Sequence, residues 1–364
     1  MNSVYGLLLL LVTICGILLF PSGRSEVHLL PFDKARTLPL RGLLALFVVI
    51  GHCDTRMPGC ALLRMLHFAT PAVSVFFFLS GYGLVRSVLG NREGYLRGFL
   101  ARSFIRLGIP LLTATVVACL FLMIRGQAVN LAHRGYELLT RGRNFPYHSW
   151  YVYALLIHYV AFALSLARGS ISRGIVRFAV FSLAYYLLFR FGLKWPGVWY
   201  KTSLAMTFGA VWAYREDVIQ GVILRLRWRV YAFVAVVLAV CVLFQTIPKA
   251  VFPWVREARD LSLLVIGPAT VLVMYILRGI SHRLTAVFAF LGGISYEIYL
   301  LHFIGERGFV GPFPGPVSYC LATILAAAGS AFLMHYFNAF LIRYAAGKSC
   351  RDDGRNGCGG GQHH

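Results

Sequence analysis

Long apolar blocks alternate with short polar connections along almost the whole chain of 364 residues. Most blocks are roughly 20 residues long, the length that a helix needs to cross a hydrocarbon core of ~30 Å. Inside lipid the backbone must satisfy its own hydrogen bonds, so such blocks must be helices. The period-2 alternation of a membrane barrel is absent from the sequence. The pattern therefore predicts an all-α, polytopic integral membrane protein.

Eleven segments of the sequence match this description, and the one at 174–193 is the weakest because Arg177 and Arg190 interrupt it. They are 4–20, 38–53, 69–85, 104–124, 148–167, 174–193, 199–214, 230–247, 261–277, 284–304 and 317–342. The first segment resembles a secretory signal, but no positive charge precedes it and no small-residue cleavage site follows it. We therefore interpret it as a retained helix.

The spans divide the chain into three parts. Residues 1–21 hold the first transmembrane helix, and residues 22–345 form a membrane domain that holds the other ten predicted spans. Residues 346–364 form a Gly-rich polar tail that we expect to be disordered.

Charge supports the membrane interpretation and adds an orientation. Only 13% of the residues are charged, against about a quarter in soluble domains, and 59% are hydrophobic. The formal net charge is +22, which in a soluble domain would suggest nucleic acid. Here the arginines lie between apolar blocks, which predicts contact with anionic lipids and no nucleic-acid partner. Their distribution places the odd-numbered connections and the C-terminus in the cytoplasm, with the N-terminus outside.

The cysteine pattern indicates no metal site. Eight cysteines are scattered along the chain without zinc-type spacing. Cys53 and Cys60 flank one short loop, and the sequence leaves open whether they pair. The terminal His363 and His364 are most simply part of a solvated tail.

Ionisable residues inside a span are costly unless they have a partner or water, so they mark candidate sites. The second span carries Arg41 and His52. Eleven steps of ~100° place both on one helical face, with a rise of ~16 Å between them. A cation near the cytoplasmic surface and a titratable imidazole deeper in the membrane suit a reaction between a cytoplasmic donor and an outward acceptor. The alternative is an arginine that snorkels and a histidine that caps the helix.

A second polar stripe lies in the span at 284–304. Ser295, Tyr299 and His302 recur at i, i+4 and i+7, which places them on one face. Glu297 is a buried carboxylate candidate for which an arginine is a possible partner. The alternative is a stripe that serves only helix packing.

The third connection is rich in arginine. Arg102 and Arg106 are four residues apart at the start of a predicted helix, so they share a face. Such a pair can bind a phosphate-bearing ligand in the cytoplasm. An anchor to lipid headgroups explains the same pair without a ligand.

At these residues the chain resembles the acyltransferase-3 family of membrane acyltransferases over roughly residues 36–342. The segments that carry the resemblance are Arg41-Gly42 through Gly51-His52, Phe76 through Tyr82, Arg102 and Arg106 with Pro110, Ser149-Trp150-Tyr151, Phe208-Gly209, and Gly293 through His302.

The resemblance implies an acyl-CoA donor, with His52 as general base and Arg41 orienting the donor or acceptor. It implies that Arg102 and Arg106 meet the CoA phosphates and that His302 is a further site residue. The chain departs from the family pattern at Leu38, where a carboxylate is common, and at Tyr82, where phenylalanine is usual. The helix at 4–20 is extra, and no esterase-like domain follows.

We therefore expect an O-acyltransferase of a bacterial inner membrane. It would move an acyl group, from acetyl-CoA or another short acyl-CoA, to a hydroxyl of a glycan or similar acceptor. Direct transfer and a covalent acyl-enzyme relay both remain open. A transporter or flippase is the alternative function, although no internal repeat supports it. A non-catalytic scaffold would leave Arg41 and His52 unexplained.

The charge pattern makes a topological prediction. A reporter fused after Leu89 should be cytoplasmic, and one fused near Pro58 should be outside, because cytoplasmic connections carry the excess of basic residues. Enzymatic reporters that work on one side only measure this directly. The opposite result would reverse the direction from Arg41 to His52.

Overall fold

The computed structural model describes residues 34–226, 282–309, 313 and 315–352, with scattered positions between 229 and 266. The described residues form helices and connections and contain no strand, which confirms the all-α class. The predicted helix at 4–20, the span at 230–247 and most of the span at 261–277 lie outside these residues, as does the tail beyond residue 352.

The longer helices follow the predicted spans closely. They are α2 (Lys34–Arg56), α4 (Ala69–Gly90), α6 (Phe99–Ile124), α8 (Trp150–Leu166), α9 (Ile171–Leu187), which continues as a π-helical turn at Leu188–Gly192, α10 (Leu204–Tyr214) and α17 (Pro316–Asp352). Shorter helices connect or extend them: α3 (Ala61–Met65), α5 (Arg92–Leu96), α7 (Leu131–Arg141), α11 (Glu216–Leu226), α14 (His282–Gly293), α15 (Ser295–Leu301) and α16 (Phe303–Gly308).

Five helices in the described part of the chain are long and apolar enough to cross a membrane, and a bent pair makes a sixth. The segment at 171–192 is one of the five, although arginines interrupt it. The helix at 150–166 is apolar but shorter, and α10 has only 11 residues. These helices support the integral membrane class. The predicted count of about ten membrane-spanning helices stays a prediction.

One predicted span has a different shape from the one expected. The segment at 284–304 is not a single straight helix, because α14 and the following α15–α16 meet at a bend of 63°. Gly292 and Gly293 lie at the end of α14, where glycine weakens the helix. A second break at His302 separates α15 from α16.

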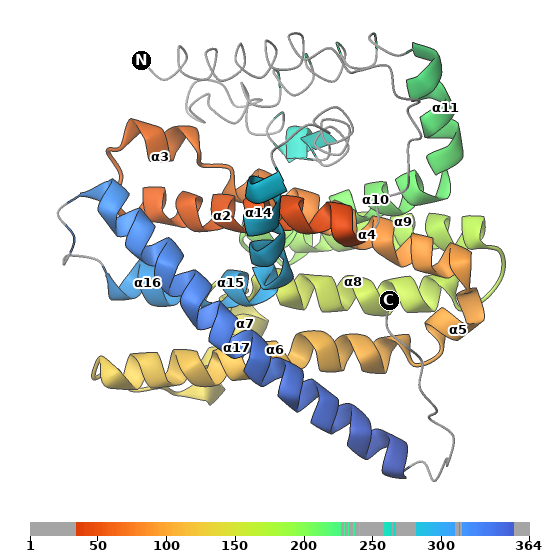
Figure 1. Ribbon diagram of the computed structural model, residues 1–364. Helices are drawn as coiled ribbons and strands as arrows, with labels where there is room; N and C mark the ends of the chain where they lie inside the picture. The colour runs from red at the N-terminus through yellow and green to blue at the C-terminus, as the bar shows by residue number, and fades with distance from the viewer. Residues whose placement is uncertain are drawn as a thin grey trace.

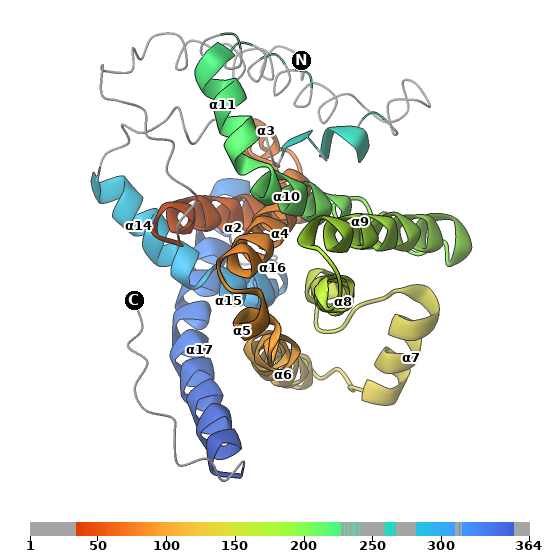
Figure 2. The same ribbon diagram turned by 90° about the vertical axis from the view of Figure 1, so that its right-hand side faces the viewer.

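Helix α2 lies at the centre of the bundle. It contacts α4, α14, α15, α16 and α17. In Figure 1, α17 crosses the front of the molecule obliquely, and α3 and α16 lie near the same end of the bundle. Figure 2 shows α7 apart from the main group of helices, beyond α6 and α8. Residues on α2 can therefore meet several segments that are distant in the sequence.

Glycines allow two pairs of helices, α4 with α10 and α2 with α14, to approach at the backbone. A Cβ atom on Gly81 would lie 1.9 Å from the carbonyl oxygen of Met206, and one on Gly209 would lie 1.9 Å from that of Phe78. The packing of α4 on α10 therefore needs both glycines. Gly42 and Gly292 have the same relation across α2 and α14. Small residues at helix contacts are the usual means of close packing in membranes.

Two positions on α4 give a matched test of this packing. Gly81→Leu should lower the thermal stability of the detergent-solubilised protein, because overpacking costs typically ~1–3 kcal/mol or more. Gly83→Leu on the same helix should be tolerated, because its Cβ would meet no atom within 4 Å. Equal melting temperatures for the two variants would contradict the close approach of α4 and α10.

Candidate active site

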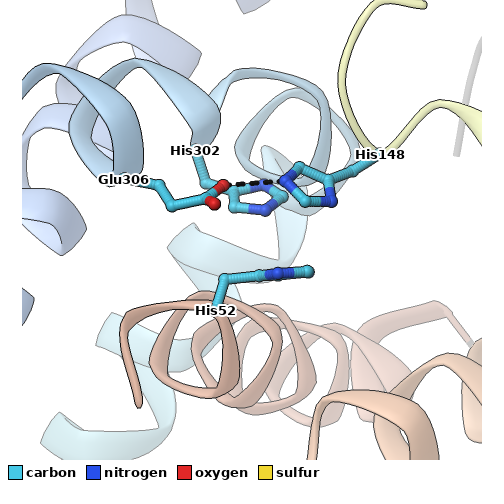
Figure 3. A group of neighbouring side chains, drawn as sticks. All are labelled: His52, His148, His302 and Glu306. Carbon is cyan, nitrogen blue, oxygen red and sulfur yellow. Dashed lines mark hydrogen bonds and ion pairs between the residues drawn. The ribbon is translucent and has the colours of Figure 1, made fainter. Parts of the chain in front are cut away.

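The imidazole of His52 meets two other histidine rings at one end of α2. Its ring centroid lies 4.0 Å from that of His148 and 4.8 Å from that of His302. The rings of His148 and His302 are 4.6 Å apart. Figure 3 shows His52 rising from α2 toward His148, His302 and Glu306 on the opposite side. Two residues chosen from the sequence, His52 and His302, are thus brought together.

A hydrogen bond to a main-chain carbonyl group fixes the imidazole of His302. It lies at the break between α15 and α16 and is fully buried. Its Nδ1 lies 2.8 Å from the carbonyl oxygen of Tyr299. A carbonyl oxygen only accepts, so Nδ1 carries the proton and Nε2 presents a lone pair. That Nε2 atom is buried and has no hydrogen-bond partner among the described residues.

A carboxylate orients His148. This residue lies in the loop before α8 and adopts a positive φ of 63°. Its Nε2 lies 2.7 Å from Oε2 of Glu306, and its carbonyl oxygen accepts a hydrogen bond of 2.5 Å from the hydroxyl of Tyr299. The backbone and the ring of His148 are therefore both fixed by residues of the α15–α16 segment.

The carboxylate of Glu306 is itself paired. Arg56, one helical turn after His52 on α2, donates from Nε to Oε1 of Glu306 at 2.7 Å. Glu306 is only 3% exposed, so both of its oxygens find their partners inside the protein. The hydroxyl of Tyr319 donates to the backbone oxygen of Glu306 at 2.5 Å. The arginine balances the buried charge, and the second oxygen is left to His148.

Sequence reasoning missed His148, Glu306 and Arg56. Glu306 follows His302 by four residues, and Arg56 follows His52 by four, so each lies one turn beyond a chosen histidine. His148 directly precedes the Ser149-Trp150-Tyr151 segment. These spacings were the available signals. By themselves these spacings do not indicate a functional site, because a carboxylate, an arginine or a histidine at such positions is common in proteins without a functional role.

The cluster has the chemistry of proton transfer and of metal binding. Imidazole nitrogens can accept or pass a proton near neutral pH, and imidazole and carboxylate groups are metal ligands. His52 makes no side-chain hydrogen bond with a described residue, so its nitrogens are available to a ligand. The ligand atoms of His52, His148, His302 and Glu306 all lie within 4.8 Å of one another, and this is the group of described residues that can hold a metal ion.

Arg41 occupies the other end of the same helix face. It is half-buried and lies within electrostatic range of Tyr151, Tyr159 and Arg106. It makes no hydrogen bond or ion pair with a described residue. Arg106 is exposed and likewise has no such partner within the described part of the chain. The two guanidinium groups thus create a cationic region in which no described residue supplies an anion.

The structure separates the roles of the two arginines on α6. Arg102 donates to the carbonyl oxygens of Arg97 at 2.7 Å and Tyr95 at 2.6 Å. Two of its nitrogens therefore order the turn between α5 and α6. Arg106, one turn later, is the one near Arg41.

Two further ionisable residues lie outside the cluster. Glu297 pairs with His335 at 3.1 Å rather than with an arginine. His158 is fully buried among the rings of Phe77, Phe178 and Tyr185, and its Nδ1 bonds the carbonyl oxygen of Ala154 at 2.8 Å. Both serve packing between helices.

The open question about the cysteines has a structural answer. Cys53 and Cys60 are both free thiols, and Cys53 is buried. Cys53 packs in the same buried cluster as Cys320 of α17.

The fold and the site define a class of protein, a polytopic α-helical membrane protein with a buried histidine–carboxylate centre. The chain matches the family model of an acyltransferase domain, that of the acyltransferase-3 family, over residues 40–335. The protein therefore belongs to the acyltransferase-3 family of membrane acyltransferases. No curated protein and no solved structure matches the chain significantly.

Proposed function

We propose that this protein is an O-acyltransferase that moves an acyl group from acyl-CoA to a hydroxyl of a glycan or similar acceptor. One observation carries the proposal. His52 faces His148 and His302 at one end of α2, and Arg41 lies near Arg106 toward the other end, and neither His52 nor Arg41 has a hydrogen-bond partner among the described residues. The family membership supports acyl transfer, and it does not favour transport or flipping of a lipid-linked substrate.

The proposed reaction assigns the proton to His52. The acceptor hydroxyl is a poor nucleophile until a base removes its proton during attack. The hydroxyl oxygen forms a bond to the thioester carbonyl carbon, and the carbon–sulfur bond breaks. The proton moves from the hydroxyl to the imidazole of His52 and from there to the CoA thiolate, which leaves as the thiol. His52 ends neutral, so atoms and charge balance.

The neighbours of His52 suit this role. The rings of His148 and His302 lie against the imidazole of His52 and hold it in place. The Arg56–Glu306 pair fixes His148 against His52. The protein around the cluster also limits access of water, which would hydrolyse the thioester.

The donor would lie along the face of α2. Acyl-CoA carries its phosphates at one end and its thioester at the other, joined by an extended arm. The ~16 Å rise between Arg41 and His52 is compatible with the phosphates near Arg41 and Arg106 and the thioester at His52. Arg102 would contribute by ordering the turn that presents Arg106.

The orientation follows from the same arrangement. We propose that the Arg41 end faces the cytoplasm, where acyl-CoA is made, and that the His52 end faces outward. The N-terminus is then outside and the C-terminus cytoplasmic in a bacterial inner membrane. We propose acetyl-CoA or another short acyl-CoA as the donor.

The base assignment predicts a large loss of rate. His52→Gln keeps the side-chain size but cannot take a proton at neutral pH, so acyl transfer should fall by about 10²–10⁴-fold. Binding of CoA and insertion in the membrane should stay normal. The measurement is release of CoA from acetyl-CoA by purified protein with acceptor.

His158→Gln is the matched control for this variant. His158 is a buried histidine on a neighbouring helix that is bonded only to a backbone oxygen, and glutamine can donate to that oxygen. This variant should keep most of the activity. If His52→Gln retained more than about a tenth of the wild-type rate, the proton acceptor would be another residue of the cluster.

The donor assignment predicts weaker binding of CoA. Arg106→Gln should raise the dissociation constant roughly tenfold or more, because a hydrogen bond to a charged group contributes ~1.5–3 kcal/mol. Isothermal titration calorimetry with CoA measures this. Arg64→Gln, an exposed arginine on α3 near the opposite end of α2, should bind CoA normally. Equal affinities for both variants would assign Arg106 to lipid contact alone.

A further inference from the structure

The spacing of the cysteines indicated no metal site, but the fold assembles a different ligand set. Two imidazoles and a carboxylate, from His148, His302 and Glu306, face one another in the interior. These residues come from the loop before α8, from the α15–α16 break and from α16. Histidine nitrogen and carboxylate oxygen are the donors of catalytic zinc sites, which use three protein ligands and keep one position open.

The surroundings of His302 are those of a metal-binding histidine. Metal-binding histidines commonly donate their second ring nitrogen to a backbone carbonyl, which fixes the tautomer and the ring. His302 does this through Nδ1 and the oxygen of Tyr299. Its Nε2 lone pair is buried, lies within the cluster and has no hydrogen-bond partner in the described part of the chain. A buried acceptor without a partner is unfavourable, and a cation would satisfy it.

Glu306 and His148 have supporting contacts as well. Arg56 holds Oε1 of Glu306, so Oε2 is turned toward His148. The hydroxyl of Tyr299 fixes the backbone of His148. A hydrogen bond now joins Glu306 and His148, and its proton occupies the space between two potential ligand atoms. Metal binding through Nε2 of His148 would move that proton to Nδ1 of the same ring, because a neutral imidazole keeps one N–H and offers its other nitrogen to the ion.

We propose that His148, His302 and Glu306 bind a divalent transition-metal ion such as Zn²⁺, with the open position facing His52. Figure 3 shows His52 on the opposite side of the group from these three residues. His52 is thereby free to remain the proton acceptor. The ion would act as a Lewis acid on the acceptor hydroxyl or on the thioester carbonyl.

A metal ion would draw the ligand atoms of the cluster closer together. Two ligand atoms of a tetrahedral zinc ion lie ~3.3–3.6 Å apart, because each Zn–N or Zn–O bond is about 2.0–2.2 Å long and the angle between two bonds is about 109°. The ligand atoms of the whole cluster lie within 4.8 Å of one another, so the most distant pair would approach by about 1 Å. The rings of His148 and His302, now stacked at 27°, would turn so that a nitrogen of each points to the ion.

The test measures metal rather than activity, so its outcome is separate from that of the acyl-transfer proposal. The full-length chain, purified in detergent without a histidine tag, is incubated with Zn²⁺ and freed of excess ion by gel filtration. Mass spectrometry of the eluted protein should find about one zinc per chain. Cobalt substitution should give the visible absorption of a low-coordinate site with nitrogen ligands.

Four variants identify the ligands. His302→Ala and His148→Gln should each lose most of the bound zinc and the cobalt absorption. His52→Gln should keep both, because it lies at the open position. His158→Ala is the matched control, since its Nδ1 also bonds a backbone oxygen and its Nε2 is also buried without a partner in the described structure. It should bind zinc as the wild type does, and the tail histidines, common to all variants, contribute equally.

Three results would overturn the proposal. They are a wild-type protein that retains no zinc, equal zinc contents in wild type and His148→Gln, and loss of zinc from His52→Gln. Because His302→Ala can fail to fold, His148→Gln, in a loop and only half-buried, serves as the independent ligand variant. A rise in the melting temperature of the wild type with Zn²⁺, absent in His148→Gln, gives a second readout.

Discussion

The carboxylate of Glu306 is the constraint on which the arrangement of the site depends. A carboxylate that is 3% exposed cannot remain charged without partners, because an unpaired buried charge costs several kcal/mol. Its two oxygens bind Arg56 from α2 and His148 from the loop before α8. One side chain of α16 thus ties together three segments that are far apart in the sequence. His52 lies one turn before Arg56, so the same ion pair also places its imidazole.

The break in the α14–α16 segment makes this arrangement possible. A straight helix over 284–304 would carry its polar residues along one line through the membrane. The 63° bend after Gly293 instead turns the α15–α16 segment, and Glu306 of α16 binds both Arg56 and His148. Close packing at Gly42 and Gly292 holds α14 against α2 at the other end of this segment. The glycines and the buried ion pair therefore work together to position the site.

The two ends of α2 differ in electrostatic character. The Arg41 end has guanidinium groups that pair with no anion in the described part of the chain, which is favourable for a phosphate-bearing ligand. At the His52 end the positive charge of Arg56 is balanced by Glu306, and what remains is a group of imidazoles. One helix thus joins a region suited to binding an anion with a region suited to moving protons. This division is the physical basis for a donor and an acceptor that approach from different sides.

The sequence by itself determined the all-α membrane class, most helix bounds and the family. Apolar block length and backbone hydrogen bonding are local requirements, so they can be read along the chain. It also indicated His52 and His302, because ionisable residues inside spans are rare. Only the tertiary structure decided that His148, Glu306 and Arg56 complete the cluster, and that Arg102 orders a turn while Arg106 lies near Arg41. These relations join residues up to 250 positions apart, and their geometry depends on a helix bend and on close helix packing that no local pattern specifies.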